Sequence, residues 1–255
     1  METARATEAT EARLRREAEF HDHTFAEDTR AELGRFYAVA RGAYDRYGAL
    51  VKEDVAGVDV LEYGCGPGSE AFALAHAGGR VQGIDISPVA IEMAQRTATE
   101  QGVADRCTFT VMNAEAVTLP DRSFDRICGS GILHHLDLER SFREIVRVLK
   151  PGGRAIFLEP LGHNPAINWY RRRTPEMRTE DEHPLLAKDL AQAARHFARV
   201  TPEFFHLAIL ASVPLQKLPY FGMVRGALDR LDKMLLNPRS PLRWAAWMTV
   251  LVLET

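Results

Sequence analysis

A loop with three glycines constrains this chain more than any other stretch. The segment Val58–Ser69 reads V-D-V-L-E-Y-G-C-G-P-G-S, and its apolar start predicts the end of a buried strand. Gly64, Gly66 and Gly68 stand at every second position, and Ala71–His76 then has the pattern of a helix. Glycine lets the backbone approach a ligand closely, and a helix N-terminus offers unpaired N–H groups. We therefore expect a small polar ligand to bind at this loop.

The spacing of the glycines separates two classes of nucleotide ligand. A dinucleotide fingerprint reads G-x-G-x-x-G, and its third glycine would stand where this chain has Ser69. The chain instead reads E-x-G-x-G-x-G from Glu62 onward, which argues against an NAD-dependent dehydrogenase. This pattern resembles motif I of the class I S-adenosylmethionine (SAM)-dependent methyltransferases.

The resemblance covers roughly residues 55–160 and includes further motifs in the family's order. An acidic residue, Asp85, ends the predicted second strand. Beyond it, the matching segments are Asn113–Asp125, Gly129–Gly131, the L-H-H-L stretch Leu133–Leu136 and the L-K-P-G-G stretch Leu149–Gly153. Many family members have Asp-Ala where this chain has Asn113-Ala114. The resemblance implies SAM as the cofactor, with S-adenosylhomocysteine as its product.

The alternation of strand and helix after Val58 predicts an α/β fold. We expect a doubly wound, mostly parallel seven-stranded Rossmann-like sheet, with N-terminal helices and a C-terminal helical insertion. Ser87 and Pro88 suit the start of a helix as N-cap and first residue. The expected strands are the end of Val58–Leu61, then Arg80–Ile86, Cys107–Met112, Phe124–Cys128, Arg154–Glu159, Arg199–Ile209 and Leu242–Leu253.

Three regions are predicted along the chain. We expect residues 1–50 to form an N-terminal helical cap, in which a polar helix or frayed tail ends near residue 19 and a second segment begins at Phe20. Residues 51–160 are the expected SAM-binding core, and residues 161–255 hold an acceptor-pocket insertion and the final strands of the same domain. His21 and His23 are two residues apart and do not share a helix face, so we expect surface or capping residues here and no metal site.

Composition and charge exclude several classes of function. The net charge of −3 gives no basic field, so no nucleic-acid partner is expected. Three separate cysteines indicate a reducing compartment, and the polar N-terminus lacks the apolar core of a signal peptide. The apolar runs are shorter than the ~20 residues of a membrane-spanning helix. We therefore expect a cytoplasmic monomer or homodimer with a small-molecule substrate.

The resemblance assigns the cofactor-binding residues. A carboxylate at Asp85 would accept hydrogen bonds from the ribose hydroxyls, and an anion at Glu62 suits the amino group of the methionine portion. An Asn113 carbonyl can still accept from an adenine amino group. The full expected set is Glu62, Tyr63, Gly64, Gly66, Gly68, Asp85, Ile86, Asn113, Ala114, Glu115 and Ser130.

The catalytic and acceptor-binding residues are predicted from their places along the sheet. His134 and His135 follow the fourth strand, where an imidazole can act as general base, although one of them can instead cap the helix or pack under the loop. The polar insertion 160–186 is expected to line the acceptor pocket, and Arg171–Arg173 to be a solvated run or an anion contact. The predicted substrate-binding residues are His163, Asn164, Tyr170, Arg178 and His183.

The function predicted from the sequence is methyl transfer from SAM to a small molecule with an apolar portion. The alternative is a SAM-binding protein that uses the cofactor structurally or for a reaction other than methylation. The amphipathic segment Tyr220–Leu236 is expected to pack on its own domain, the alternatives being a lid, a dimer surface or a shallow membrane contact.

Overall fold

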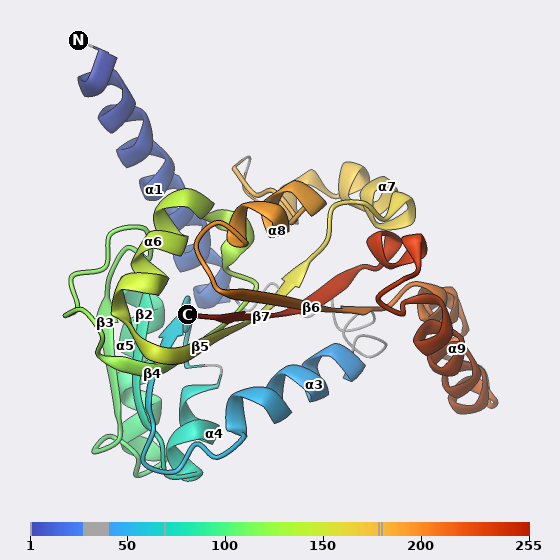
Figure 1. Cartoon of the computed structure of the whole chain (residues 1–255), viewed down its shortest axis with the longest axis horizontal. Coiled ribbons are helices and arrows are strands. Elements are labelled where there is room, and N and C mark those ends of the chain that lie inside the picture. Colours follow the sequence, from blue (N-terminus) through green and yellow to red (C-terminus); the bar gives the residue numbers. More distant parts are fainter. Residues whose placement is uncertain (1, 28–40, 69, 178, 180) are drawn as a thin grey trace.

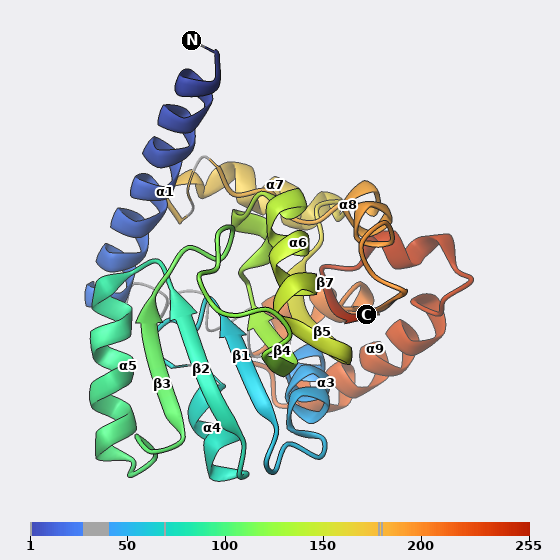
Figure 2. The same cartoon turned by 60° about the vertical axis from the view of Figure 1, so that its left-hand side comes forward.

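The fold is a seven-stranded sheet with helices on both faces, as the sequence predicts (Figures 1 and 2). The computed structural model describes residues 2–27, 41–68, 70–177, 179 and 181–255. The strand order is β3-β2-β1-β4-β5-β7-β6, in which β7 runs antiparallel to both of its neighbours and the first five strands are parallel. The strands are β1 Asp59–Tyr63, β2 Arg80–Asp85, β3 Cys107–Val111, β4 Phe124–Ser130, β5 Leu149–Pro160, β6 Arg199–Phe205 and β7 Met248–Glu254.

Two hydrophobic cores lie on the two faces of this sheet. Alternate residues of a strand point to opposite faces, so Val60 of β1 joins one core and Leu61 joins the other. One core packs α3 (Arg41–Lys52), α4 (Ala71–His76) and α5 (Pro88–Glu100). The other packs α6 (Leu138–Val148) and α8 (Ala187–Ala193). The remaining helices are α1 Glu2–Glu27, α7 Pro165–Arg173 and α9 Phe221–Leu235.

The order of the strands fixes where a ligand can bind. The chain winds outward from β1 through β2 to β3, and then returns to β4 on the other side of β1. Such a reversal opens a crevice at the carboxyl ends of β1 and β4, which is where ligands bind in open α/β sheets. The glycine loop follows β1 directly and therefore lies at this crevice.

The N-terminal segment forms one helix. The break that was expected near residue 19 is absent, so this prediction is wrong. Helix α1 runs over Glu2–Glu27, a stretch without glycine or proline to end it. It contacts α5 and reaches the carboxyl ends of β2 and β3 (Figure 2). Residues 28–40, where part of the expected second helix falls, lie outside the described residues.

Three of the expected strand boundaries are wrong. Strand β5 begins at Leu149 and not at Arg154, because Leu149 already pairs with Phe124 of β4. Strand β6 ends at Phe205 because the chain then turns into the 3₁₀ segment Ala208–Leu215. The carboxylate of Asp232 accepts hydrogen bonds from the N–H groups of residues 207–209 and so stabilises this turn. The last strand, β7, begins at Met248, because Pro241 opens a 3₁₀ turn over Pro241–Ala245.

The sequence predicts that the chain has no membrane-spanning helix, and the length and hydropathy of the helices test this prediction. Among the described residues, no helix combines the length and the apolar character that crossing a bilayer requires.

Gly83 offers a test of the close packing beneath the glycine loop. A Cβ at this position would lie 2.6 Å from the Phe109 ring and 2.9 Å from Cys65 Sγ. Overpacking of this kind costs typically about 1–3 kcal/mol, so we expect Gly83→Ala to lower the free energy of unfolding by that amount in urea denaturation.

The matched control is Gly222→Ala in α9, where an added Cβ meets no atom within 4 Å. This variant should be neutral or stabilised by up to about 1 kcal/mol. Equal unfolding free energies for the two variants would contradict the packing described for β2.

Candidate active site

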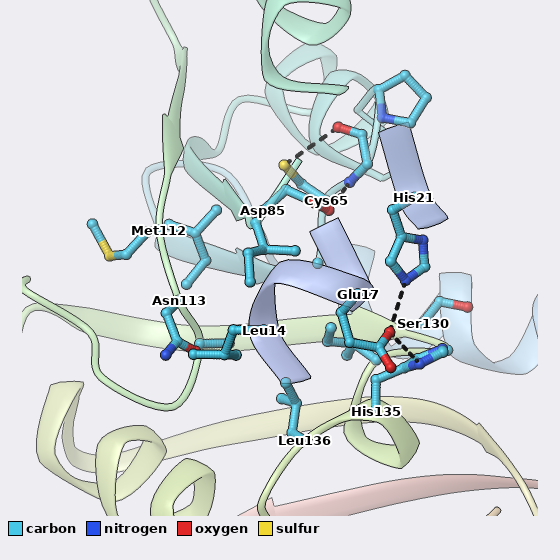
Figure 3. Close-up of a pocket in the computed structure, with 18 of the residues that line it drawn as sticks. Leu14, Glu17, His21, Cys65, Asp85, Met112, Asn113, Ser130, His135 and Leu136 are labelled. Carbon is cyan, nitrogen blue, oxygen red and sulfur yellow. Dashed lines mark hydrogen bonds and ion pairs between the residues drawn. The ribbon is translucent and has the colours of Figure 1, made fainter. Parts of the chain in front are cut away.

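A cavity of about 530 Å³ opens at the carboxyl ends of β1, β2 and β4 (Figure 3). One part of its wall comes from the loops that follow the strands, at residues 64–67, 84–86, 112–114 and 130–132. Another part comes from α1, which lies across the opening and contributes Arg13, Leu14, Glu17 and His21. The site is therefore built from the glycine loop and from a helix far from that loop in sequence.

The glycine loop approaches the cavity with its backbone. Gly64 has a φ of +60°, and a Cβ there would come within 2.7 Å of the Ile132 side chain. Gly66 also has a positive φ, of +51°, and donates its N–H to Asp85. Cys65 lines the cavity between them, but burial raises the pKa of its thiol, which opposes a nucleophilic role.

Asp85 holds the glycine loop against the end of β2. Its Oδ2 accepts from the Gly66 N–H at 2.8 Å, and its Oδ1 accepts from the Ser87 N–H at 2.9 Å. A carboxylate has about four acceptor sites, so these two bonds leave capacity for hydroxyl groups of a ligand. Asp85 lines the cavity although only 9% of it is exposed. This geometry fits the vicinal hydroxyls of a ribose.

The segment after β3 forms the next part of the wall. Asn113 and Ala114 line the cavity, and the Asn113 Oδ1 accepts from the Glu115 N–H at 2.9 Å. Glu115 itself is buried outside the lining, where its carboxylate accepts from Arg13 and from the Asp137 N–H. Together with Ile86 and Ser130, which also line the cavity, these residues surround a space suited to a nucleoside.

Besides Glu115, three of the expected cofactor residues lie outside the cavity lining. Both carboxylate oxygens of Glu62 accept N–H groups at the start of α4, from Glu70 at 2.9 Å and Ala71 at 3.0 Å. The Tyr63 ring packs edge-on against Phe157 in the core, and Gly68 adjoins the Phe72 ring. Glu62 therefore shapes the loop by capping the helix that follows it. A direct contact of any of the three with a ligand stays a prediction.

The two histidines after β4 have different surroundings. His135 lines the cavity, and its Nδ1 lies 3.1 Å from Glu17 Oε2. His134 lies outside the lining, with its Nδ1 2.6 Å from Glu159 Oε2. The other oxygen of Glu159 accepts from the backbone N–H groups of residues 132 and 133, so this carboxylate fixes the whole turn. Of the two histidines after β4, only His135 is placed to contact a ligand in this cavity.

Helix α1 contributes a polar face that the sequence analysis missed. Arg13, Glu17 and His21 recur every four residues and line the cavity together (Figure 3). His21 Nε2 lies 3.6 Å from Glu17 Oε2, and the rings of His21 and His135 meet edge to face. Burial alone would raise the pKa of Glu17, but hydrogen bonds to the two histidines hold this pKa well below its usual range. The four-residue spacing was the available signal.

Among the described residues, those expected to bind the acceptor do not line this cavity. Asn164 is buried and caps α7, accepting from the N–H groups of residues 166 and 167 while its Nδ2 donates to the Ala245 carbonyl. His163 Nε2 accepts from the Ala187 N–H, and the His183 N–H donates to the His134 carbonyl. Tyr170 lies in α7 outside the lining, and Arg178 lies outside the described residues. The polar insertion thus stabilises the turn that carries His134 and His135, through the backbone hydrogen bond from His183 to His134.

The Arg171–Arg173 run has structural partners. Arg171 forms an ion pair with Glu182 at 2.8 Å, and the guanidinium of Arg173 stacks on Trp169 at 4.0 Å. Neither residue lines the cavity, so the anion contact considered for this run is not part of the site.

Comparison with known proteins identifies the domain around this cavity. Residues 61–157 match a family model described as a methyltransferase domain. Over these residues the chain is similar to a methyltransferase domain. The match begins within β1 and ends within β5, so it includes the glycine loop, Asp85, Asn113 and the histidine turn.

Several curated methyltransferases share this domain in sequence. Aklanonic acid methyltransferase DauC from Streptomyces sp. (strain C5) is 37% identical over 115 residues, which are 44% of this chain and 52% of that protein. Methyltransferase GfsG from Streptomyces halstedii is 39% identical over 101 residues, 39% of this chain and 36% of that protein. The chain thus spans between about a third and a half of these relatives.

Several solved structures share the fold of this chain over most of its length. Geranyl diphosphate C-methyltransferase from Streptomyces coelicolor A3(2) aligns with a TM-score of 0.58 at 16% identity, over 82% of this chain and 77% of that one. The [4+2]-cyclase SpnF aligns with a TM-score of 0.56 at 22% identity, over 83% and 80%. At these identities the likeness concerns the fold.

The attachment of α1 to the site depends on Arg13. Its guanidinium donates to the buried Glu115 carboxylate at 2.5 Å and to the His135 carbonyl at 3.0 Å. We expect Arg13→Met to loosen α1 and to speed amide hydrogen exchange across Leu14–Phe20 by about tenfold or more, since each hydrogen bond to a charged group contributes about 1.5–3 kcal/mol.

Arg15→Met is the control, because Arg15 is exposed on the same helix. Its exchange should match that of the wild type. Unchanged exchange in Arg13→Met would show that α1 is held by other contacts.

Proposed function

We propose that this protein transfers the methyl group of SAM to a small-molecule acceptor that has an apolar portion. The observation that supports this proposal is the composition of one cavity. Its strand-end loops present Asp85, Asn113 and glycine backbone, which suit SAM, while α1 and His135 supply a second wall. Because the chain spans only part of its curated relatives, the activity of the whole protein is inferred from this site.

The residues that would hold SAM follow from the lining. Asp85 would bind the ribose hydroxyls, Asn113 and Ala114 the adenine, and the glycine loop with Ser130 the methionine portion. Gly64 suits the last role because its place has no room for a side chain. When bound, SAM supplies a methyl group on a positively charged sulfur, a good leaving group for in-line displacement.

The chain's own contribution is to position the acceptor and to exclude water. Helix α1 lies across the cavity, so a reaction beneath it is shielded from solvent. Holding the acceptor in line with the methyl group converts a bimolecular encounter into an intramolecular one, which can supply much of the acceleration. Leu14, Tyr44 and Leu136 line the same space and would contact an apolar part of the acceptor.

We propose that His135 is the histidine that acts on the acceptor. An imidazole at this place can accept a proton from the acceptor or donate a lone pair to a metal ion. His134, held by Glu159, would act as a positioning residue that fixes the turn carrying His135. The predicted acceptor residues His163, Asn164, Tyr170 and His183 would influence the acceptor only through this turn or from outside the cavity.

The alternative, a SAM-binding protein without methyl transfer, is not favoured. The curated relatives quoted above are named as methyltransferases, and the likeness to the cyclase quoted above concerns the fold alone. Incubation with methyl-labelled SAM and pools of small acceptors separates the two functions. Transferred label supports the methyltransferase, whereas its absence across all pools, in protein that binds SAM, would contradict it.

Asp85 gives a direct test of the cofactor assignment. Loss of hydrogen bonds to a charged group costs about 1.5–3 kcal/mol, so Asp85→Ala should weaken SAM binding by about 10- to 150-fold in calorimetry. Asp105→Ala, at an exposed acid outside the cavity, is the control and should bind as the wild type does. Undiminished binding by Asp85→Ala would remove the ribose assignment.

His135 and His134 should differ in kinetics. We expect His135→Gln to lower kcat by about 100-fold or more, the contribution typical of a side chain at the reacting group, while the Kd for SAM changes less than about threefold. His134→Gln should lower kcat less, because it acts through the turn. A kcat for His135→Gln equal to that of the wild type would place the acceptor elsewhere.

A further inference from the structure

A glutamate and two histidines meet at the wall of the cavity, Glu17 and His21 from α1 and His135 from the turn after β4. Glu17 Oε2, His21 Nε2 and His135 Nδ1 offer three donor atoms that all lie within 4.8 Å of one another. The side chains are only 5%, 15% and 10% exposed, in that order. Dashed lines in Figure 3 join the carboxylate of Glu17 to both imidazoles.

The distances in this cluster match those between ligands of one metal ion. Around an ion with bonds of 2.0–2.1 Å in tetrahedral geometry, neighbouring donor atoms lie about 3.3 Å apart. Glu17 Oε2 lies 3.1 Å from His135 Nδ1 and 3.6 Å from His21 Nε2. A carboxylate and one imidazole at such a distance can share a proton in a hydrogen bond, and all three side chains together can bind a metal ion. Because the second imidazole also lies near the same carboxylate oxygen, we favour the metal ion.

We propose that Glu17, His21 and His135 bind one divalent transition-metal ion, with Zn²⁺ as the best match. Two imidazoles and one carboxylate are a donor set typical of catalytic zinc, which keeps a further position open. Mg²⁺ and Ca²⁺ prefer oxygen ligands and suit this set less well. Glu17 and His21 are four residues apart on one helix, so a single face of α1 presents both of them.

A second cluster nearby is less suited to a metal ion. His134, His135 and Glu182 also lie close together, but Glu182 is ion-paired with Arg171 at 2.8 Å. His134 gives its Nδ1 to Glu159. A guanidinium beside the carboxylate opposes a second cation, and we therefore assign the ion to the cluster on α1.

The open position of the ion would face the acceptor. All three ligands line the cavity, so a bound ion is accessible from it. It would coordinate an oxygen of the acceptor and hold this atom within reach of the methyl donor, which narrows the acceptor to molecules with a hydroxyl, enol or carboxylate oxygen. This role rests on the proposed function, whereas the binding of the ion does not.

The test is a calorimetric titration of Zn²⁺ into chelator-treated protein without a histidine tag. We expect one ion per chain. Changes to outer partners of metal ligands cost about 10- to 100-fold in affinity, so loss of a ligand in Glu17→Gln or His21→Ala should cost about 100-fold or more. His23→Ala is the matched control, a histidine exposed on the same helix, and should bind Zn²⁺ within about threefold of the wild type.

The SAM affinity of each variant, measured in parallel, keeps the two proposals separate. Stoichiometric Zn²⁺ binding that Glu17→Gln and His21→Ala lose while they retain SAM binding supports the site. Absence of Zn²⁺ binding by the wild type, or equal affinity in Glu17→Gln, would overturn it. Failure of the wild type to bind SAM would instead refute the proposed function and leave the metal result standing.

Discussion

The hydrogen bonds of Asp85 are the interaction on which the rest of the site depends. One carboxylate oxygen holds the N–H of Gly66 and the other holds the N–H of Ser87, so the loop after β1 is fixed to the end of β2. This link restrains a loop whose glycines restrict the backbone little by themselves. The carboxylate that organises the loop is also the one that faces the cavity. Loop geometry and ligand recognition are therefore coupled in a single side chain.

The two walls of the cavity arise from the chain in different ways. The wall suited to SAM is made by consecutive strand-to-helix connections, whose ends meet at one edge because the strands are parallel. The other wall needs α1, which reaches this edge from the N-terminus and is held there by the buried ion pair of Arg13 with Glu115. Glu115 belongs to the connection that also carries Asn113. Closure over the acceptor is thus linked to the part of the site that would bind the cofactor.

Much of the fold and of the first wall can be predicted from the sequence. Strand-helix alternation, a Ser-Pro helix start and the glycine spacing are local signals. They predict the sheet that the structure shows and the likeness of residues 61–157 to a methyltransferase domain. The second wall cannot be found in this way. Glu17 and His21 are spaced as neighbours on a helix face, but their partner His135 is more than a hundred residues away.

The polar insertion shows what residue type alone leaves open. Its histidines and its asparagine have the composition of a binding loop, and the sequence analysis placed them in the acceptor pocket. In the structure Asn164 caps a helix and His183 supports the turn of His134 through its backbone. Capping and ligand binding use the same hydrogen-bonding groups, so residue type alone does not separate them. The position of each group relative to the cavity is what distinguishes a capping residue from a ligand-binding one.

The most direct test of this account is a crystal structure of the protein with S-adenosylhomocysteine bound. The account predicts the ribose on Asp85, the adenine beside Asn113 and Ala114, and the sulfur facing the space bounded by α1 and His135. A ligand bound in this cavity with its sulfur directed away from α1 and His135, or bound outside the cavity, would contradict the assignment of the two walls.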